Sequence, residues 1–325
     1  MTATEIVVAD IGGTHARFAI ATVAAGQFVG LGPETVMRAA DHASLQTAWE
    51  AFAAERGRPL PRAAGIAVAC PATGEVLKLT NNPWIIRPAL IADKLGLDRF
   101  VLINDFGAVG HAVAQAGPEQ FRHLCGPDTV IPAAGVISIV GPGTGLGVAQ
   151  VLRAGGGYHV IPTEGGHVDF TPVDALEDAI LARLRRRYRR VSTERIVSGP
   201  GLAAIYEALA AIEGRAVVPT DDNSLWTAAL TGTDSLAAAA FDRFCLALGT
   251  FAGDVALAQG ACAVVIAGGL GQRLADRLPQ SGFGQRFAAK GRFEGLMAAI
   301  PVKLIVHPQP GLFGAAAAFA RDHAA

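Results

Sequence analysis

The sequence of 325 residues contains only four cysteines and carries almost no net charge. Cys70, Cys125, Cys245 and Cys262 form no Cys-x-x-Cys motif and no Cys/His cluster, so we expect neither a disulfide nor a zinc site. The 27 basic and 28 acidic residues leave a net charge of −1, which gives no global field to attract nucleic acid or an anionic membrane. We therefore predict no nucleic-acid partner and expect partners to be selected at a local site.

The N-terminal segment lacks the features of an export signal. Only nine residues precede Asp10, and they include neither a basic region nor a signal-length apolar core, which favours a cytoplasmic location. The uncharged segment 129–152 is long enough to cross a bilayer, but Pro132, Pro142 and five glycines divide it into short strand-like pieces. We interpret it as core and predict no membrane partner.

The composition is that of a folded protein, with 51% hydrophobic and 17% charged residues. It excludes disorder, collagen and coiled coil, and allows one large core or two moderate ones. One pattern occurs twice: strands at 5–9 and 17–21 flank the turn Asp10–Thr14, and strands at 136–140 and 148–152 flank the turn Gly141–Gly147. More than a hundred residues separate the copies. This predicts two α/β domains, each opening with a hairpin whose turn faces a shared cleft.

The remaining elements place the domain boundaries. We predict a small α/β domain at 1–115 with strands at 64–69 and 100–103 and helices at 44–56 and 107–116, and a larger domain at 116–307. The larger domain has predicted helices at 172–188, 201–212, 236–258 and 271–278 and strands at 264–267 and 302–306. The alanine-rich helix 308–325 is expected to pack back on the first domain.

Both glycine-rich turns offer backbone N–H groups to an anion, for which phosphate is the usual ligand. Neither is a Walker loop, because no Gly-Lys-Ser/Thr follows, and Leu146 breaks the dinucleotide fingerprint in the second. Either turn alone also fits an ordinary hairpin, but two turns that each carry a threonine, Thr14 and Thr144, favour phosphate binding. Asp10 suits a Mg²⁺ ion held through water, because Mg²⁺ prefers oxygen ligands and sheds its waters reluctantly.

Three further segments are candidates for a ligand site. Gly268 and Gly269 follow a strand and open a helix, so a base or ribose can approach the backbone there, although a plain strand-to-helix turn has the same sequence. Asn104 and Asp105 end a strand, where ligands bind in α/β sheets. A carboxylate at Asp105 can accept an alcohol proton while Asn104 binds a neighbouring hydroxyl; the alternative is that Asp105 only caps a helix.

The third segment, Glu164-Gly-Gly-His167, is predicted to be a loop that can hold several sugar hydroxyls. Metal binding by His167 is disfavoured, because no second His or Cys stands at ligand spacing. Glu194 is consistent with a helix N-terminus stabilised through the macrodipole. We interpret the arginine run at 183–190 as a solvated helix face rather than a polyanion site.

Six motifs stand in a fixed order: Asp10-Ile-Gly-Gly-Thr, Leu102-Ile-Asn-Asp-Phe, Gly141-Pro-Gly-Thr-Gly-Leu-Gly, Glu164-Gly-Gly-His-Val-Asp-Phe, Ser198-Gly-Pro-Gly and Ile266-Ala-Gly-Gly. Together, from residue 5 to about 315, they resemble the bacterial ATP-dependent glucokinases. The resemblance implies a two-domain, actin-like or hexokinase-type (ribonuclease H-like) α/β fold with an inter-domain cleft. It also implies transfer of phosphate from ATP, with Mg²⁺, to O6 of glucose as the first step of glycolysis, and a homodimer.

The resemblance also implies residue roles. Asp105 becomes the catalytic base. The glucose-binding residues become Asn104, Asp105, Glu164, His167 and Glu194. The nucleotide-binding residues become Asp10, Gly12, Gly13 and Thr14 in the first loop, Gly141, Gly143, Thr144 and Gly145 in the second, and Gly268 and Gly269 near adenosine.

The sequence departs from the family at His15, where these enzymes commonly carry Asn. Imidazole can still hydrogen-bond a phosphate or a sugar hydroxyl, so the departure affects one contact and not the reaction. The related repressor and sugar-kinase family often has a zinc motif and a DNA-binding domain, and both are missing here. The alternatives are a kinase of another hexose, a non-catalytic sugar-sensing protein, and an actin-like or chaperone ATPase.

Overall fold

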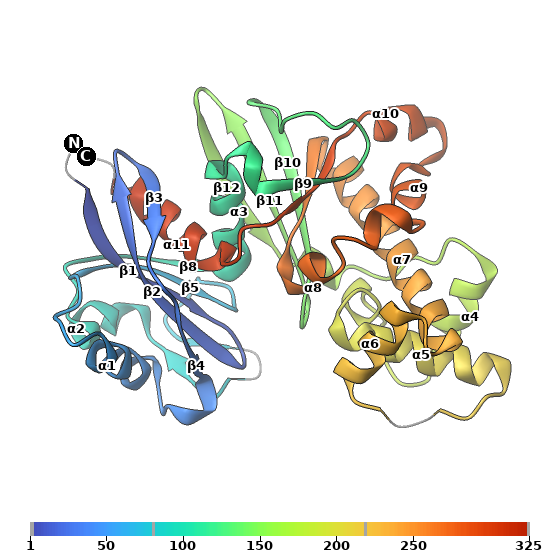
Figure 1. The fold of residues 1–325 in the computed structure, drawn as a ribbon, viewed down its shortest axis with the longest axis horizontal. Coiled ribbons are helices and arrows are strands. Elements are labelled where there is room, and N and C mark those ends of the chain that lie inside the picture. Colours follow the sequence, from blue (N-terminus) through green and yellow to red (C-terminus); the bar gives the residue numbers. More distant parts are fainter. Residues whose placement is uncertain (1–2, 80–81, 218–219, 324–325) are drawn as a thin grey trace. The chain divides into compact units, whose positions relative to one another are not determined.

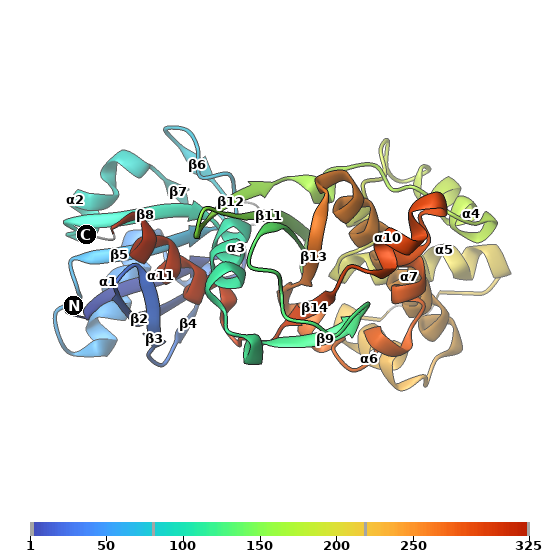
Figure 2. The ribbon, with the colours of Figure 1, turned by 90° about the horizontal axis from the view of Figure 1, so that it is seen from above.

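The computed structural model describes residues 3–79, 82–217 and 220–323, and the chain divides into two compact units. Unit 1 comprises Met1–Gly117, Val160–Pro162 and His307–Ala325, and unit 2 comprises Pro118–His159 and Thr163–Val306. Each unit is an α/β structure built on its own sheet (Figures 1 and 2).

Unit 1 is built on a mixed sheet in the order β3-β2-β1-β5-β8, with β4 also paired to β2. Its strands are β1 (Thr4–Ile11), β2 (His15–Ala24), β3 (Gln27–Leu31), β4 (Thr35–Arg38), β5 (Ala63–Val68) and β8 (Arg99–Asn104). β1 and β2 form the predicted antiparallel hairpin, whereas β1, β5 and β8 run parallel. Ile11 stands beside Val68, which stands beside Asn104. The hairpin turn and the end of β8 therefore lie at the same edge of the sheet.

Helices cover both faces of this sheet. They are α1 (Leu45–Arg56), α2 (Ile91–Leu95), α3 (Asp105–Gln115) and α11 (Pro310–Asp322), and a small hairpin joins β6 (Leu77–Lys78) to β7 (Ile85–Ile86). Along β1, alternate side chains enter different clusters: Val7 packs with Trp49 and Phe52, and Val8 packs with Leu312 of α11. This alternation is the period of a strand buried on both sides.

Helix α11 comes from the far end of the chain and packs against α3, β1 and β5 in unit 1 (Figure 1). Glycine makes this close approach possible. A Cβ atom at Gly314 would overlap the carbonyl oxygen of Ala108 in α3, and one at Gly65 would overlap that of Ala315. The expected packing of a C-terminal helix onto the first part of the chain is therefore a contact between backbones.

Unit 2 repeats the hairpin-plus-parallel arrangement in a sheet of order β12-β11-β10-β13-β14-β9. Its strands are β9 (Phe121–Cys125), β10 (Gly135–Pro142), β11 (Leu146–Ala154), β12 (Gly157–Thr163, of which Val160–Pro162 belong to unit 1), β13 (Ala261–Ile266) and β14 (Val302–Ile305). β10 and β11 are antiparallel, and β10, β13 and β14 are parallel. The segment 129–152 thus lies in the β10–β11 hairpin and the loop before it.

The helices of unit 2 are α4 (Ala175–Leu184), α5 (Gly199–Glu213), α6 (Asp222–Thr231), α7 (Ser235–Gln259), α8 (Gly268–Arg273), α9 (Phe283–Ala288) and α10 (Glu294–Ala298). Among the residues that the structure describes, α7 alone is long and apolar enough to cross a membrane. However, 67% of its apolar window is buried inside the protein, and Phe244 and Phe251 lie in the main apolar cluster. α7 is therefore packed as a core helix.

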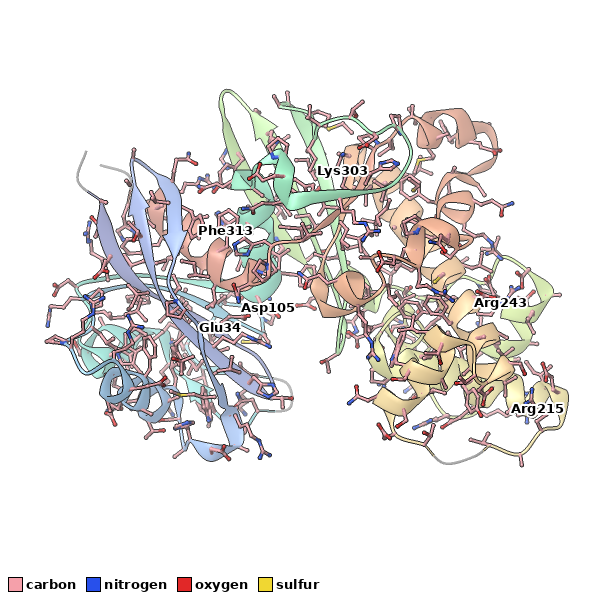
Figure 3. The ribbon with its side chains drawn as sticks, in the orientation of Figure 1. Glu34, Asp105, Arg215, Arg243, Lys303 and Phe313 are labelled. Atoms are coloured by element: carbon pink, nitrogen blue, oxygen red, sulfur yellow. The ribbon has the colours of Figure 1, made fainter. Side chains whose placement is uncertain are left out.

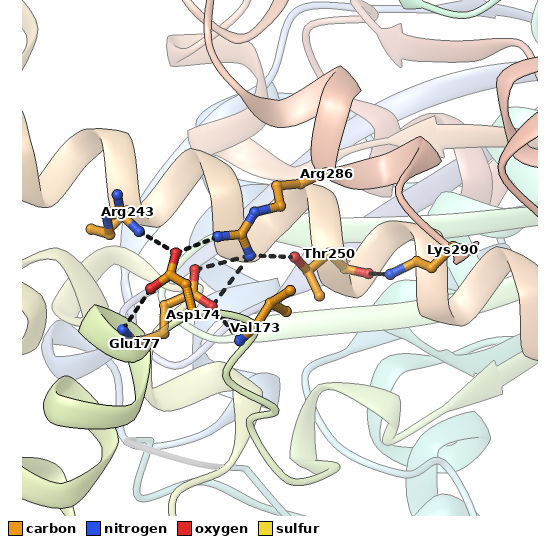
Figure 4. A network of polar contacts seen from close by, with 7 residues as sticks. All are labelled: Val173, Asp174, Glu177, Arg243, Thr250, Arg286 and Lys290. Carbon is orange, nitrogen blue, oxygen red and sulfur yellow. Dashed lines mark hydrogen bonds and ion pairs between the residues drawn. The ribbon is translucent and has the colours of Figure 1, made fainter.

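A polar network fastens α4 to α7 and α9 (Figure 4). Asp174 caps α4 by accepting a hydrogen bond from the amide of Glu177, and its other oxygen pairs with Arg243 at 2.7 Å and Arg286 at 2.6 Å. Burial raises the pKa of Asp174, but the Glu177 amide and Arg243 lower it more, so the carboxyl titrates below its usual range. Glu177, 3% exposed, also pairs with Arg286. This charge pairing compensates the burial of Glu177.

Two predicted helices of unit 2 differ from those in the structure. The helix predicted at 172–188 is confined to Ala175–Leu184, because Asp174 caps its start and the chain turns after Leu184. The helix predicted at 271–278 begins three residues earlier, at Gly268, and ends at Arg273. The glycine pair before it is therefore the first turn of the helix itself.

Candidate active site

The first glycine turn connects β1 to β2 in unit 1. The amide of Gly12 donates to the carbonyl of His15 at 2.9 Å, and the carbonyl of Gly12 accepts from Asn82 Nδ2 at 3.0 Å. Asn82 is 8% exposed and was not singled out from the sequence. The Gly12 amide therefore forms its hydrogen bond within the turn, and it is not available to a phosphate in this conformation. Gly13 and the exposed Thr14 remain at the tip.

Asp10 lies in β1 opposite Arg17, whose Nη1 is 3.9 Å from Oδ2, and 21% of the Asp10 side chain is exposed. Burial raises the pKa of the carboxyl, and the Arg17 guanidinium opposes that rise. A Cβ atom at Gly311 would stand 2.6 Å from Oδ2, so the carboxylate lies against the first turn of α11. The positive end of a helix favours a negative charge there.

A magnesium ion at this point would depend on other ligands. Within the described parts of the chain, no three His, Cys, Asp or Glu side chains are grouped to hold a metal. Asp10 is a single, largely buried carboxylate, which suits an ion that keeps several waters and takes further oxygens from a phosphate substrate. The residues present are compatible with that arrangement.

Asn104 ends β8 and Asp105 begins α3; Asp105 is labelled in Figure 3. Asn104 keeps an extended backbone and is the N-cap: its Oδ1 accepts from the amides of Phe106 at 2.9 Å and Gly107 at 3.0 Å. Its Nδ2 donates to the carbonyl of Cys70 at 3.2 Å. The alternative that Asp105 is the N-cap is therefore wrong, because the cap is the last non-helical residue and Asp105 already belongs to the helix.

Asp105 is the first helical residue, and its side chain is half-buried. Its Oδ1 accepts from the amide of Phe106 at 2.8 Å. The positive end of α3 stabilises the ionised carboxylate in this position. Through the strand register given above, Asp105 follows directly on the residue aligned with Ile11, just before the first glycine turn. A carboxylate and a glycine-rich turn therefore occupy one edge of the unit 1 sheet.

The second glycine turn connects β10 to β11 in unit 2. The amide of Gly143 donates to the carbonyl of Gly145 at 2.8 Å, and the carbonyl of Gly143 accepts from the amide of Gly199 at 2.7 Å. As in unit 1, one expected phosphate donor is committed to the turn itself, while Thr144 is exposed at the tip. Gly199 is the first residue of the 15-residue helix α5. The positive end of α5 thus lies beside the turn, which favours an anion there.

Gly268 approaches the same turn from β13. Its φ is +81°, and a Cβ atom would stand 2.6 Å from the carbonyl oxygen of Pro142. The sequence predicts that a base or ribose approaches Gly268 closely. In the structure the carbonyl of Pro142 makes this close approach instead. Gly269 has nothing within 4 Å of its Cβ position and is exposed, so the open space lies at the second glycine of the pair.

The segment 164–167 is a single 3-10 turn, Gly165–His167, rather than an irregular loop. A Cβ at Gly166 would overlap the carbonyl oxygen of Leu146, so the turn rests on the start of β11. The amide of Thr193 donates to the carbonyl of Val168 at 2.8 Å. This pairing brings the turn beside the 3-10 turn Thr193–Arg195.

Glu194 connects this segment to the glycine turn. Its Oε1 is 4.0 Å from His167 Nδ1, and its Oε2 accepts from the amide of Leu146 at 2.9 Å. A Cβ at Gly145 would stand 2.6 Å from that oxygen. Glu194 does lie in the first turn of a helix, but this is the three-residue 3-10 turn Thr193–Arg195, and its carboxylate binds the start of β11.

The arginine run is largely solvated, as predicted, but most of it does not lie on a helix. Helix α4 ends at Leu184, before most of the run. Arg190 Nε pairs with Asp169 at 2.5 Å, and its Nη2 donates to the carbonyl of His167 at 2.8 Å. The Arg190 side chain therefore stabilises the turn that carries His167. Nothing in the local sequence distinguishes Arg190 from the other arginines of the run.

The candidate residues thus form two groups, one in each unit. Unit 1 holds Asp10, Gly12, Gly13, Thr14, Asn104 and Asp105, and unit 2 holds Gly141, Gly143, Thr144, Gly145, Glu164, His167, Glu194, Gly268 and Gly269. Each group combines a glycine-rich turn with carboxylates, and His167 and Glu194 are in contact.

Comparison with known proteins identifies relatives that share nearly the whole chain. A family model described as glucokinase matches residues 7–322. A glucokinase of Zymomonas mobilis is 64% identical over 319 residues, which are 98% of both chains. The crystal structure of a glucokinase from an Antarctic psychrotroph is 34% identical with a TM-score of 0.84, covering 97% of this chain and 98% of that one. A ROK-family glucokinase from Streptomyces griseus, solved with glucose and AMPPNP, shares the fold at 18% identity and a TM-score of 0.60, covering 96% and 98%.

Proposed function

The chain belongs to the glucokinase family, and from that premise we propose that it transfers the γ-phosphoryl group of ATP to O6 of glucose. The proposal rests on one structural observation, made at the edge of the unit 1 sheet where β8 meets α3. There Asp105 follows the residue in register with Ile11, next to a glycine-rich turn. A proton acceptor and a phosphate-binding turn at one sheet edge are what phosphoryl transfer to an alcohol requires.

The proposed chemical step uses Asp105 as general base. O6 of glucose attacks the γ-phosphorus in line, the bond from that phosphorus to the bridging oxygen breaks, and ADP leaves with the electron pair. The O6 proton passes to the Asp105 carboxylate. Because Asn104 carries the cap, the Asp105 carboxylate is spared that role, and its Oδ1 accepts from the amide of Phe106.

Glucose is proposed to bind through residues of both units: Asn104, Asp105, Glu164, His167 and Glu194. Carboxylates, an amide and an imidazole together accept and donate hydrogen bonds, as a ring of sugar hydroxyls requires. Since these residues lie in different units, we expect closure of an actin-like, two-domain cleft on the sugar to complete the site and exclude water.

ATP is proposed to bind at both glycine turns. The amides of Gly12 and Gly143 are committed, so the phosphate donors are expected at the tips, from Gly13 and Thr14 and from Thr144 and Gly145, with Gly269 next to adenosine. Asp10 would orient Mg²⁺ through water, and the ion would neutralise phosphate charge. We further propose a cytoplasmic homodimer.

A coupled assay of glucose 6-phosphate formation tests this function. Glucose should be phosphorylated with ATP, and ATP hydrolysis without sugar should be a small fraction of that rate, because the site is incomplete until the sugar binds. Equal ATP turnover with and without glucose would refute the proposal in favour of an ATPase. A panel of epimeric hexoses in the same assay tests the second candidate, a kinase of another hexose.

A further inference from the structure

Glu194 is placed between the sugar residues and the nucleotide turn of unit 2. One carboxylate oxygen faces His167 Nδ1 at 4.0 Å, and the other accepts from the Leu146 amide at 2.9 Å. An ionised carboxylate has about four lone-pair positions. It can therefore hold the Leu146 amide and accept from sugar hydroxyls at the same time.

The contact on the turn side leaves little room for movement. The Cβ position of Gly145 is 2.6 Å from Oε2 of Glu194, whereas Gly143, two residues earlier in the same turn, has nothing within 4 Å of its Cβ position. The backbone carrying Glu194 is also fixed, because the amide of Thr193 donates to Val168 and the amide of Ile196 donates to Thr193. A carboxylate that keeps its hydrogen bond to the Leu146 amide is therefore held against the turn.

We propose that Glu194 is a positioning residue that couples sugar binding to nucleotide binding within unit 2. A sugar that fixes the Glu194 carboxylate also fixes the Leu146 amide, and with it the tip of the turn at Thr144 and Gly145. By linkage, the factor by which the sugar tightens nucleotide binding equals the factor by which the nucleotide tightens sugar binding. This inference rests on the proposed function and adds to it a route of communication between the two substrates.

The coupling predicts effects that cross from one substrate to the other. A residue that only contacts phosphate cannot change sugar affinity when no nucleotide is present. Likewise, a residue that only contacts sugar cannot change nucleotide affinity when no sugar is present. These two cross effects separate coupling from simple ligand contact.

The first experiment measures glucose binding to the full-length protein by calorimetry, without nucleotide. Gly145→Ala forces a methyl group against the Glu194 carboxylate and is expected to weaken glucose binding by about tenfold, within the usual range of coupling between sites. The control is Gly295→Ala in α10, which also enters open space but lies outside both proposed binding sites, and it is expected to change glucose affinity by less than about twofold. Equal glucose affinities of the two variants would overturn the coupling.

The second experiment measures binding of AMPPNP with Mg²⁺, without sugar. Glu194→Ala is expected to weaken it by about tenfold, because the Leu146 amide loses its acceptor. Glu164→Gln, the control on the sugar side, should leave it unchanged. Wild-type nucleotide affinity in Glu194→Ala would overturn the inference. This arm also decides the question if Gly145→Ala fails to fold, as a thermal melt would show.

The failure of the inference differs from failure of the proposed function. If the wild-type protein neither binds glucose nor phosphorylates it, the proposed function is refuted. If the wild-type protein is an active glucose kinase but the cross effects are missing, only the coupling through Glu194 is refuted.

Discussion

Replacement of Asp105 by asparagine separates chemistry from helix capping at the end of β8. Asparagine cannot accept the O6 proton, and the loss of a general base typically lowers turnover by about 10² to 10⁴. The amide oxygen can still accept from Phe106, as Oδ1 of Asp105 does at 2.8 Å. We therefore expect Asp105→Asn to bind glucose with little change and to lose most of its turnover.

The stability cost follows from the position of Asp105 in α3. Since Asn104 makes both capping hydrogen bonds, Asp105→Asn keeps the cap and loses the favourable interaction of a charge with the helix dipole, roughly 0.3–1 kcal/mol. The matched variant Asn104→Ala removes the cap instead and should cost about 1–2 kcal/mol. It retains the Asp105 carboxylate. Asp105→Asn is therefore expected to lose rate, whereas Asn104→Ala is expected to lose stability and, because Asn104 belongs to the proposed glucose site, glucose affinity as well.

The assay combines a thermal melt, a glucose titration and steady-state kinetics on the same preparations. The expected result is a folded Asp105→Asn protein with a turnover number at least about a hundredfold below wild type. The melt should show Asn104→Ala as the less stable of the two variants. A folded Asp105→Asn protein with near-normal turnover would refute the assignment of Asp105 as the base.

Three further perturbations have expected outcomes. Glu164→Gln and His167→Ala should each raise the glucose KM by about tenfold or more, because each loses a hydrogen bond to the sugar. Calorimetry with AMPPNP should show an unchanged nucleotide affinity. Weaker nucleotide binding with an unchanged glucose KM would contradict their place in the sugar site. Gly314→Ala forces α11 away from α3 and should cost at least about 3 kcal/mol by denaturant unfolding, whereas Gly30→Ala, which enters open space, should cost under about 1 kcal/mol; similar midpoints would contradict the backbone contact. Burial lowers the pKa of His111 to about 4, below its unfolded value. The buried ring is therefore neutral above about pH 6.5, and about 3 kcal/mol of stability should be lost as the pH falls from there to about 4. His111→Gln should flatten that part of a pH–stability curve, and an unchanged curve would reject His111 as its source.

The two hairpins and the Asn104–Asp105 junction could be predicted because their signals are local. β-branched residues on both sides of a glycine cluster indicate a strand, a turn and a strand, and the structure confirms both hairpins. The alternative that Asp105 caps the helix was wrong; the sequence could not decide this, because Asn and Asp cap equally well and only the backbone angles of residue 104 identify it as the cap.

Contacts between distant residues could not be predicted in this way. Asn82 reaches the carbonyl of Gly12 across 70 positions, and Arg190 reaches His167 from within a run of chemically similar arginines. The close contact between Gly268 and the carbonyl of Pro142, at a position predicted for a ligand, also depends on the packing of β13 against β10. Helix α6 was missed because half of its ten residues are polar and only Leu225, Trp226 and Ala229 are buried.

The return of α11 to unit 1 has a consequence for the order in which the protein is made. One face of the first sheet, with Ile6 and Val8, is covered by Leu312 and Phe319, which are synthesised after every strand of that sheet. At about 5–20 residues per second, the chain between Gly117 and His307 takes roughly 10–40 s to synthesise. During that time the emerging sheet exposes an apolar face, which is a target for chaperones. Unit 2, although later in the sequence, has all of its strands before unit 1 has its last helix.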